Sequence, residues 1–309
     1  MSQSTQLEEV SCVICHSTDL HHYQVKGQFA IPLNLSLCKN CGLSFLSPRW
    51  TKKRYLQYYA HEYDEHYRPA EVANSRTDDP ANFKRYGTID QRLKSKGFPM
   101  DSIKNLLDVG SGEGNILTYF QQHYPELAYF AIEPSEECIQ ILEGKGVNVL
   151  SNDADADWEK GNEGKFDFII MRHVLEHFMN PLTVLEKVQH VLSDKGMLYL
   201  AVPNALHLKA PFYERWLRVV HTYYFNRISL RNILHKAGFE IAWLQEGDEA
   251  NREELFVVAK KSKTPQKIEI DSSNYELQRK AYEDKMKEEK NPLYQMRRSV
   301  GKLVKKLRS

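Results

Sequence analysis

Residues 105–114 read Asn-Leu-Leu-Asp-Val-Gly-Ser-Gly-Glu-Gly, and this stretch decides the fold. Asn105–Val109 has the apolar character of a buried strand, and a helical pattern follows the glycines through about Tyr124. Glycine lets the turn between them adopt conformations that a Cβ would forbid, and it lets a ligand approach the backbone closely. The stretch therefore predicts a strand, a ligand-binding turn and a helix in succession.

Strands and helices continue to alternate after this turn. Further strands are predicted at residues 128–132, 147–150, 166–171 and 197–202, and Pro134-Ser135 and Asn180-Pro181 begin helices between them. A helix over Ser229–Lys236 stops at Gly238, and residues 239–245 and 254–260 form a closing pair of strands. The alternation predicts an α/β fold around a parallel, doubly wound sheet that is complete by about residue 262.

The glycine turn differs from that of a nucleotide-dependent dehydrogenase. Its pattern is GxGxG, whereas the dinucleotide-binding turn is GxGxxG. Asp108 stands two residues before the first glycine, Gly110. A carboxylate at this place repels a pyrophosphate but attracts a cationic group. The turn therefore favours a ligand with a positively charged end.

Three segments in order, residues 106–114, 131–134 and 166–177, together resemble the class I S-adenosylmethionine-dependent methyltransferases. The resemblance covers roughly residues 104–260. It implies a Rossmann-like seven-stranded sheet, mostly parallel, with a last, antiparallel strand at Glu254–Lys260. It also implies that S-adenosylmethionine is the cofactor and methyl donor. The implied roles place Asp108 near the methionine moiety, the backbone of Gly110 and Gly112 along the cofactor, Glu133 on the ribose hydroxyls and Asp153 at the adenine amino group, with the chain around His173 completing the pocket.

Four of the five cysteines form two CxxC pairs, Cys12 with Cys15 and Cys38 with Cys41. This is the two-knuckle spacing of a zinc ribbon, in which four thiolates hold Zn²⁺ tetrahedrally. The segment is too small to bury a self-sufficient core, so the metal replaces one. Four thiolates leave no open coordination position, and the zinc is therefore expected to be structural.

Composition narrows the class of protein. The chain has 309 residues, is 41% hydrophobic and has a formal net charge of +1, so it lacks the basic excess typical of nucleic-acid binding. The polar start is not that of a secretory signal, and the apolar runs are far shorter than the roughly 20 residues that span a bilayer. We expect a cytoplasmic protein in which the cysteines stay reduced.

Four regions are expected along the chain. Residues 1–47 form the zinc-ribbon-like module, 48–100 a Tyr-rich helical connector, 101–262 the methyltransferase domain and 263–309 a charged tail. The tail begins as an exposed helix or a disordered segment and ends in a basic amphipathic helix, with Met296, Val300, Leu303, Val304 and Leu307 on one face. Such a helix can lie peripherally on the inner face of an anionic membrane, and a solvated helix or one docked on a partner subunit remains the alternative.

The cysteine module adds a narrower resemblance. Two CxxC pairs, a following proline and a Tyr-rich link before the methyltransferase core look like bacterial methyltransferases of surface-polysaccharide or natural-product sugar pathways. The resemblance implies a small-molecule or lipid-linked saccharide acceptor. Sugar C-methyltransferases of that type carry a further C-terminal domain, for which this chain is too short. O- or N-methylation is therefore the expectation.

A sugar hydroxyl needs a base to take its proton, and imidazole suits this role near neutral pH. His221 is the preferred base because it lies in the insertion after the fifth strand, and His177 is the second candidate. A purely structural role remains open for each. Residues 173–177 also match the HxxEH pattern of a zinc protease, which requires a helix at that place, and Glu176 with His177 could instead hold a divalent ion.

Two other functions stay open. One is an RNA methyltransferase whose zinc ribbon grips the nucleic acid. Between Cys12 and Cys41, however, only Lys26 and Lys39 are basic apart from histidines, which is a poor footprint for a phosphate backbone. The other is a non-catalytic scaffold that has kept the cofactor-binding fold.

Overall fold

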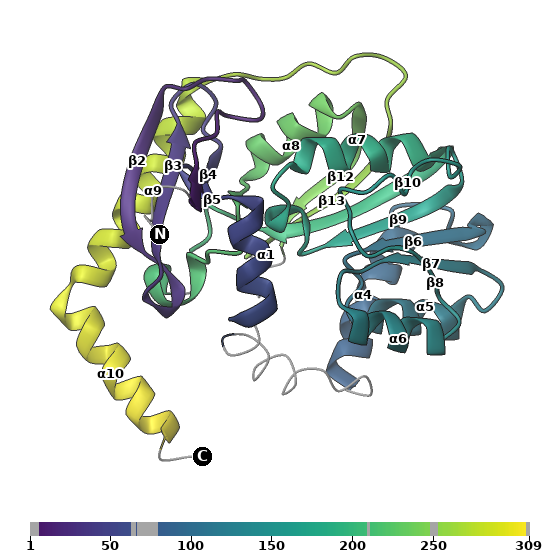
Figure 1. Cartoon of the computed structure of the whole chain (residues 1–309), viewed down its shortest axis with the longest axis horizontal. Helices are drawn as coiled ribbons and strands as arrows, with labels where there is room; N and C mark the ends of the chain where they lie inside the picture. Colours follow the sequence, from purple (N-terminus) through teal and green to yellow (C-terminus); the bar gives the residue numbers. More distant parts are fainter. Residues whose placement is uncertain (1–5, 63–65, 67–79, 209–210, 248–252, 307–309) are drawn as a thin grey trace.

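The computed structural model describes residues 6–62, 66, 80–208, 211–247 and 253–306 (Figure 1). Its centre is a seven-stranded sheet with the order β12-β13-β10-β9-β6-β7-β8. The strands are β6 (Asn105–Val109), β7 (Ala128–Ile132), β8 (Asn148–Ser151), β9 (Phe166–Arg172), β10 (Leu192–Pro203), β12 (Phe239–Glu246) and β13 (Glu254–Lys261). Neighbouring strands from β8 to β10 pair in parallel, and β13 pairs antiparallel with both β10 and β12. The predicted fold class, including the antiparallel last strand, is confirmed.

Helices cover both faces of this sheet (Figure 1). One face carries α4 (Pro80–Ser95), α5 (Asn115–His123) and α6 (Glu136–Gly144), and the other carries α7 (Pro181–Val191) and α8 (Arg227–Lys236). Each face has its own apolar core. Leu117 and Phe120 of α5 pack under one face, and Val184 and Ile233 pack over the other. Both sides of the parallel strands are therefore buried, as such sheets require.

The strand order reverses between β6 and β9, because the chain proceeds from β6 toward β8 on one side and from β9 toward β10 on the other. In open α/β sheets, ligands bind in the crevice outside the carboxyl ends of the strands at this switch point. The glycine turn and residues 173–177 follow β6 and β9 directly. The topology thus brings the two predicted site segments to the same edge of the sheet.

A smaller sheet holds the cysteine-containing segment and has the order β11-β4-β3-β2. Three of its strands are N-terminal: β2 (Leu20–Lys26), β3 (Pro32–Cys38) and β4 (Ser44–Leu46). The fourth, β11 (Tyr223–Tyr224), comes from the chain after the fifth strand of the large sheet and pairs antiparallel with β4. A separate pair joins β1 (Leu7–Glu8) to β5 (Arg49–Trp50). The N-terminal segment is therefore built together with the insertion that contains His221.

Short helical turns complete the connections. They are η2 (Gln28–Ala30), η3 (Met100–Ser102), η4 (Leu175–His177) and η5 (Phe212–Trp216). The Tyr-rich connector forms α1 (Lys52–His61) before α4. Residues 63–65 and 67–79 of this predicted connector lie outside the described residues.

The charged tail forms two helices, α9 (Ser272–Lys290) and α10 (Pro292–Lys306). The expectation of an exposed or disordered first segment is wrong for α9, because one side of this helix is buried against the small sheet. Tyr282 and Gln278 are fully buried, and the side chain of Asn274 donates to the backbone oxygen of Cys41 at 2.7 Å. Most of the charges of α9 lie on its other side, whereas Lys285 and Glu289 belong to the buried side, and this mixture concealed the buried stripe in the sequence. None of the helices in the described part of the chain has the length and apolar content to cross a bilayer.

Candidate functional site

The glycine turn after β6 is shaped by backbone conformations that only glycine adopts readily. Gly110, Gly112 and Gly114 have φ values of 76°, 55° and 72°. A Cβ at Gly110 would lie 2.6 Å from the side chain of Val174, whereas a Cβ at Gly112 would meet nothing within 4 Å. Gly110 thus permits close packing against the β9 loop, and Gly112 leaves open space where a ligand can reach the backbone.

Glu133 ties this turn to the end of β7. Its Oε2 accepts the backbone N–H of Gly112 at 2.7 Å, and its Oε1 accepts that of Ser135 at 3.0 Å. Ser135 in turn caps α6 by accepting the N–H of Cys138. The side chain is buried and joins the glycine turn to the start of α6.

Asp108 is buried at the end of β6. Burial raises the pKa of this carboxyl to about 7, and the nearby charge of Glu133 adds to the shift, while Arg172 opposes it. A buried carboxylate beside another acid is stabilised when a cation arrives. The amino-acid end of S-adenosylmethionine carries such a charge, so the chemistry of Asp108 fits this cofactor.

Two polar atoms of the glycine turn strengthen the fit. The hydroxyl of Ser111 and the side-chain oxygen of Asn115 are buried and have no hydrogen-bond partner among the described residues. Buried polar atoms rarely remain unpaired, because each costs free energy unless a partner is present. A polar ligand in the turn would supply those partners.

Asp153 lies beyond β8 and its side chain is 51% exposed, 3.7 Å from the ammonium of Lys52. Lys52 begins α1 and also donates to Asp155 at 3.1 Å. The connector helix therefore reaches over the end of the sheet where the adenine ring was expected. Nothing in the sequence signalled this contact, because 101 residues separate Lys52 from Asp153.

His173 follows β9 in a left-handed conformation with φ of 55°, which is uncommon for a residue with a side chain. Its Nε2 lies 3.2 Å from Glu254 Oε1, and its Nδ1 lies 3.7 Å from Glu176 Oε1. Burial alone would lower the pKa of His173, but these two carboxylates raise it above its ordinary value. Glu254, at the start of β13, was missed by the sequence analysis because its contact depends on the antiparallel strand.

His177 and His221 come together although they are far apart in sequence. Their rings meet edge to face with 4.7 Å between centroids. One ligand atom from each of them and one carboxylate oxygen of the buried Glu176 lie within 4.8 Å of one another. The predicted base candidates and Glu176 therefore form one cluster, the Glu-His-His cluster. It sits on η4 and the chain before β11, outside any α-helix, so the HxxEH segment lacks the helix of a zinc protease.

The electrostatics of the cluster favour neutral imidazoles. Burial lowers the pKa of His221 well below its ordinary value, and His177, Arg218 and His173 lower it further. Burial also lowers the pKa of His177, although Glu176 acts in the opposite direction. Neutral imidazole is the form that can accept a proton.

Thr222 holds the two parts of the cluster in register. Its hydroxyl lies within hydrogen-bonding distance of the backbone oxygens of Glu176, at 3.1 Å, and Phe178, at 2.7 Å. The backbone oxygen of Thr222 accepts a hydrogen bond from the backbone N–H of Leu46 in β4 at 2.9 Å. The cysteine-containing sheet thus supports the backbone that carries His221.

The four predicted zinc ligands also gather at one place. The sulfur atoms of Cys12 and Cys41 are 3.4 Å apart, and those of Cys15 and Cys38 are 3.5 Å apart. Zinc–sulfur bonds of about 2.3 Å in a tetrahedron separate neighbouring sulfurs by roughly 3.8 Å, so a small expansion accommodates the ion. The donor set fits Zn²⁺.

Comparisons with known proteins agree with this geometry. Residues 65–243, more than half of the chain, match a family model described as "Methyltransferase domain". No curated protein sequence matches the chain closely enough to count as a relative.

Solved structures share the fold at low sequence identity. The plantazolicin methyltransferase BpumL, solved in complex with SAH, is 15% identical with a TM-score of 0.52, covering 67% of this chain and 93% of its own. The PH0226 protein from Pyrococcus horikoshii OT3 is 15% identical with a TM-score of 0.50, covering 67% and 99%. With the family match over residues 65–243, the glycine turn and the strand order, the chain belongs to the methyltransferase domain family and is an S-adenosylmethionine-dependent methyltransferase.

Proposed function

We propose that this enzyme transfers a methyl group to a hydroxyl or amino group of a saccharide acceptor, either a small molecule or a lipid-linked saccharide of surface-polysaccharide or natural-product biosynthesis. The observation that carries the proposal is the Glu-His-His cluster beside the cofactor turn. Burial favours the neutral form of its imidazoles, which supports a role for them in accepting the proton of a hydroxyl group. The saccharide class itself is supported by the sequence resemblance of the cysteine module and its Tyr-rich link.

The cofactor would be held by the residues at the ends of β6, β7 and β8. Asp108 would face its cationic amino group, the backbone of Gly110 and Gly112 would line it, Glu133 would accept the ribose hydroxyls, and Asp153 would lie near the adenine. His173 completes the floor of this pocket. S-adenosylmethionine supplies an activated methyl group bonded to a sulfonium. The protein's own task is to orient the acceptor in line with that bond and to exclude water.

The proposed transfer balances without another reactant. The acceptor oxygen forms a bond to the methyl carbon while the carbon–sulfur bond breaks. The electron pair of the broken bond stays on sulfur. The hydroxyl proton moves to His221, and His177 stands beside it. The products are the methylated saccharide, S-adenosylhomocysteine and a protonated imidazole, which then releases its proton to water.

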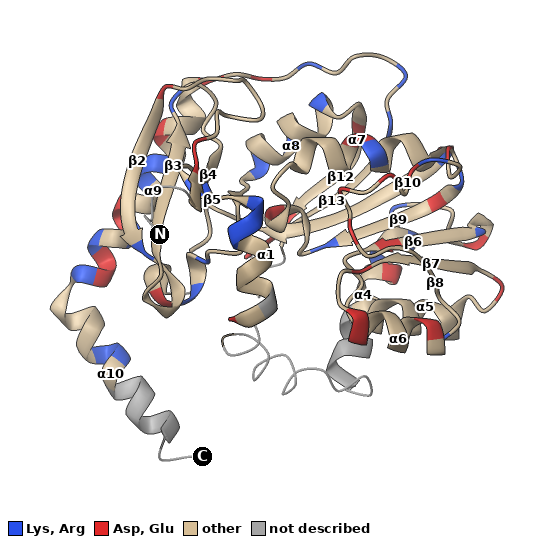
Figure 2. Cartoon of the chain, in the orientation of Figure 1, with Lys and Arg blue, Asp and Glu red and all other residues tan. Residues whose placement is uncertain are grey.

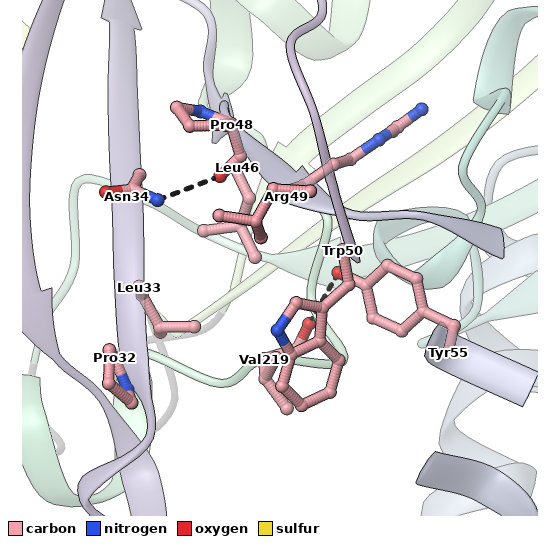
Figure 3. A pocket seen from close by; sticks show the side chains of 10 residues that line it. Pro32, Leu33, Asn34, Leu46, Pro48, Arg49, Trp50, Tyr55 and Val219 are labelled. Carbon is pink, nitrogen blue, oxygen red and sulfur yellow. Dashed lines mark hydrogen bonds between the residues drawn. The ribbon is translucent and has the colours of Figure 1, made fainter. Parts of the chain in front are cut away.

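We propose that Zn²⁺ bound by the four cysteines has a structural role and fixes one wall of the acceptor site. A small pocket between the N-terminal sheet and α1 shows how these parts meet (Figure 3). Leu33 of β3 and Trp50 of β5 line it together with Val219, and the hydroxyl of Tyr55 donates to the backbone oxygen of Val219 at 3.0 Å. Val219 lies two residues before His221, so the module and α1 both hold the chain that carries the base.

Incubation of the full-length enzyme with methyl-radiolabelled S-adenosylmethionine and separated host fractions tests the proposal. The fractions are nucleotide sugars, lipid-linked saccharides, RNA and protein. We expect label in a saccharide fraction. Label confined to RNA would replace the saccharide assignment with the RNA alternative, although Lys and Arg residues are interspersed with Asp and Glu residues along the described chain (Figure 2). Cofactor binding without label in any fraction would support the scaffold alternative.

Replacing Glu133 by alanine should weaken the binding of S-adenosylhomocysteine about 10- to 100-fold. The change removes a carboxylate proposed to bind the ribose hydroxyls, and charge-assisted hydrogen bonds contribute about 1.5–3 kcal/mol. It also removes the acceptor to which the backbone N–H groups of Gly112 and Ser135 donate. Isothermal titration calorimetry measures the affinity, and Glu126→Ala, which removes an exposed acid, is the control. Unchanged affinity in Glu133→Ala would exclude the ribose role.

The C-terminal helix is proposed to hold the enzyme on an anionic membrane, near a lipid-linked acceptor. After Glu289 the chain contains no acid and seven basic residues: Lys290, Arg297, Arg298, Lys302, Lys305, Lys306 and Arg308. Leu293 and Met296 of α10 are 63% and 59% exposed. Figure 1 shows α10 extending away from the rest of the protein, and Figure 2 shows basic residues along its described part. Apolar exposure and positive charge together suit an anionic lipid surface.

Truncation after Asn291 should therefore abolish most binding to vesicles that contain anionic phospholipid, measured by co-sedimentation at low salt. Lys305→Glu with Lys306→Glu in the full chain should give a similar loss, because it reverses charge without removing the helix. Neither change should reduce the affinity for S-adenosylhomocysteine. Equal vesicle binding by the full and truncated chains would contradict the membrane role.

A further inference from the structure

The proposed proton transfer gives no role to the carboxylate of Glu176 in the Glu-His-His cluster. Glu176 is 2% exposed, and its Oε2 has no hydrogen-bond donor among the described residues. Its Oε1 lies 3.7 Å from His173 Nδ1, which is too long for a good hydrogen bond. A buried carboxylate with an unpaired oxygen is unfavourable unless a positive or donating group approaches during the working cycle.

The neighbours of Glu176 show which group this is. The charged or titratable side chains around the two imidazoles are Glu176, Arg218 and His173, together with the imidazoles themselves. Arg218 and His173 both disfavour a proton on His221, and Glu176 is the acid that opposes them at His177. When a hydroxyl gives up its proton here, the new imidazolium is buried and is disfavoured by the positive charge of Arg218. It needs a counter-charge, and Glu176 is placed to provide it.

We propose that Glu176 is a positioning residue whose buried carboxylate stabilises the imidazolium formed when the His177–His221 pair accepts the acceptor proton. This inference rests on the proposed function, because it concerns the same site. The carboxylate itself takes up no proton. It lowers the energy of the protonated pair, and its unpaired oxygen gains a donor at the moment of transfer.

The surrounding contacts keep Glu176 in place for this role. The Thr222 hydroxyl lies 3.1 Å from the Glu176 backbone oxygen, and the backbone N–H of His177 bonds to Val174 within the same turn. Thr222 is next to His221 in sequence, so its hydrogen bond to the backbone of Glu176 connects the residue that bears the carboxylate with the residue beside the base. The Glu176 oxygen and the ligand atoms of His177 and His221 lie within 4.8 Å of one another. Because they are buried, a carboxylate and an imidazolium attract each other more strongly here than in water.

Titration of the imidazoles tests the inference without any acceptor. The full-length zinc-loaded protein is labelled with ¹³C-histidine and titrated by NMR as wild type and as Glu176→Gln, which keeps the shape and removes the charge. We expect Glu176→Gln to lower the pKa of His177 by about 1, because an opposite charge within about 4–6 Å shifts a pKa by that much or more. Glu176→Asp should recover part of the shift. An unchanged pKa of His177 in a folded Glu176→Gln protein would overturn the proposal.

Kinetics on the labelled acceptor fraction complete the test. Single-turnover methyl transfer should fall about 10-fold in Glu176→Gln, in line with the loss of about one pKa unit, with the acid limb of its pH profile moved to lower pH. Thr222→Val is the matched structural variant: it loosens the same turn without changing charge, so it should leave the pH of that limb in place. Glu240→Gln, an exposed acid on β12, should change neither quantity.

The outcomes separate this inference from the proposed function. Wild-type transfer to saccharide with an unaltered Glu176→Gln profile would overturn the inference alone. Absence of wild-type transfer to any saccharide would remove the proposed function, while the NMR titration still reports on the charge of Glu176. A second equivalent of bound metal in wild type that is lost in Glu176→Gln would overturn the inference in favour of a divalent cation held by Glu176, His177 and His221.

Discussion

Replacing Cys38 and Cys41 together by serine should remove the bound zinc and lower the midpoint of thermal unfolding by at least about 10 °C. Four-thiolate zinc sites contribute apparent binding free energies of about 10 kcal/mol or more, comparable with the whole stability of a typical domain. The loss should spread beyond the N-terminal segment. Asn274 of α9 is bonded to the Cys41 backbone, and β4 pairs with β11 of the methyltransferase part.

Elemental analysis and calorimetric scanning of the purified protein measure the two effects. Cys138→Ser is the matched control, since Cys138 lies in α6 outside the cluster. It should retain one zinc per chain and a nearly unchanged unfolding midpoint. Full zinc content in the Cys38→Ser/Cys41→Ser protein, or no zinc in wild type, would reject the zinc assignment.

Replacing His221 by alanine should reduce single-turnover methyl transfer about 100- to 10,000-fold, the range that a positioned general base contributes. The low pKa of His221 keeps the ring neutral at pH 7 and ready to accept a proton. The wild-type rate should therefore hold through neutral pH and fall only on the acid side, as the imidazole becomes protonated. The affinity for S-adenosylhomocysteine should stay the same, because the ring belongs to the acceptor side of the site.

The measurement uses rapid mixing with the acceptor fraction that becomes labelled. His221→Asn removes the base while filling more of the space, and it should be as slow as His221→Ala. His190→Ala, which removes a half-exposed ring from α7, is the control and should transfer methyl at the wild-type rate. A near-normal rate in both His221 variants, with the fold intact, would show that another group accepts the proton.

A buried network of amide side chains connects the parts of the molecule that these two predictions concern. The side-chain N–H₂ of Asn226 donates to Asn274 Oδ1 and to Gln278 Oε1, each at 2.9 Å. Gln278 then donates to the backbone oxygen of Ala205 at 2.8 Å. Asn226 also caps α8, the helix that follows the His221 insertion. Hydrogen bonds therefore connect the cysteine module, α9 and the cap of α8.

The sequence by itself determined the central sheet and predicted that the proposed cofactor-binding residues lie at one edge of it. The strands at Asn105–Val109 and Ala128–Ile132 agree with their predicted bounds. This worked because apolar runs, glycines and helix-starting residues are local signals, and because a parallel sheet places the ends of its strands at one edge. Asp108, Gly112 and Glu133 were predicted to lie together for the same reason, and Glu133 accepts the N–H of Gly112.

Only the tertiary structure brought the Glu-His-His cluster together. Glu176 and His221 meet through a loop and a short β11 that pairs with a strand from the far end of the chain. Lys52 lies 3.7 Å from Asp153, and Tyr282 of the charged helix α9 is fully buried. No sequence pattern predicts either contact. Such contacts depend on how separate elements pack, and packing follows from complementary shape and burial over the whole molecule, which spacing along one chain does not encode.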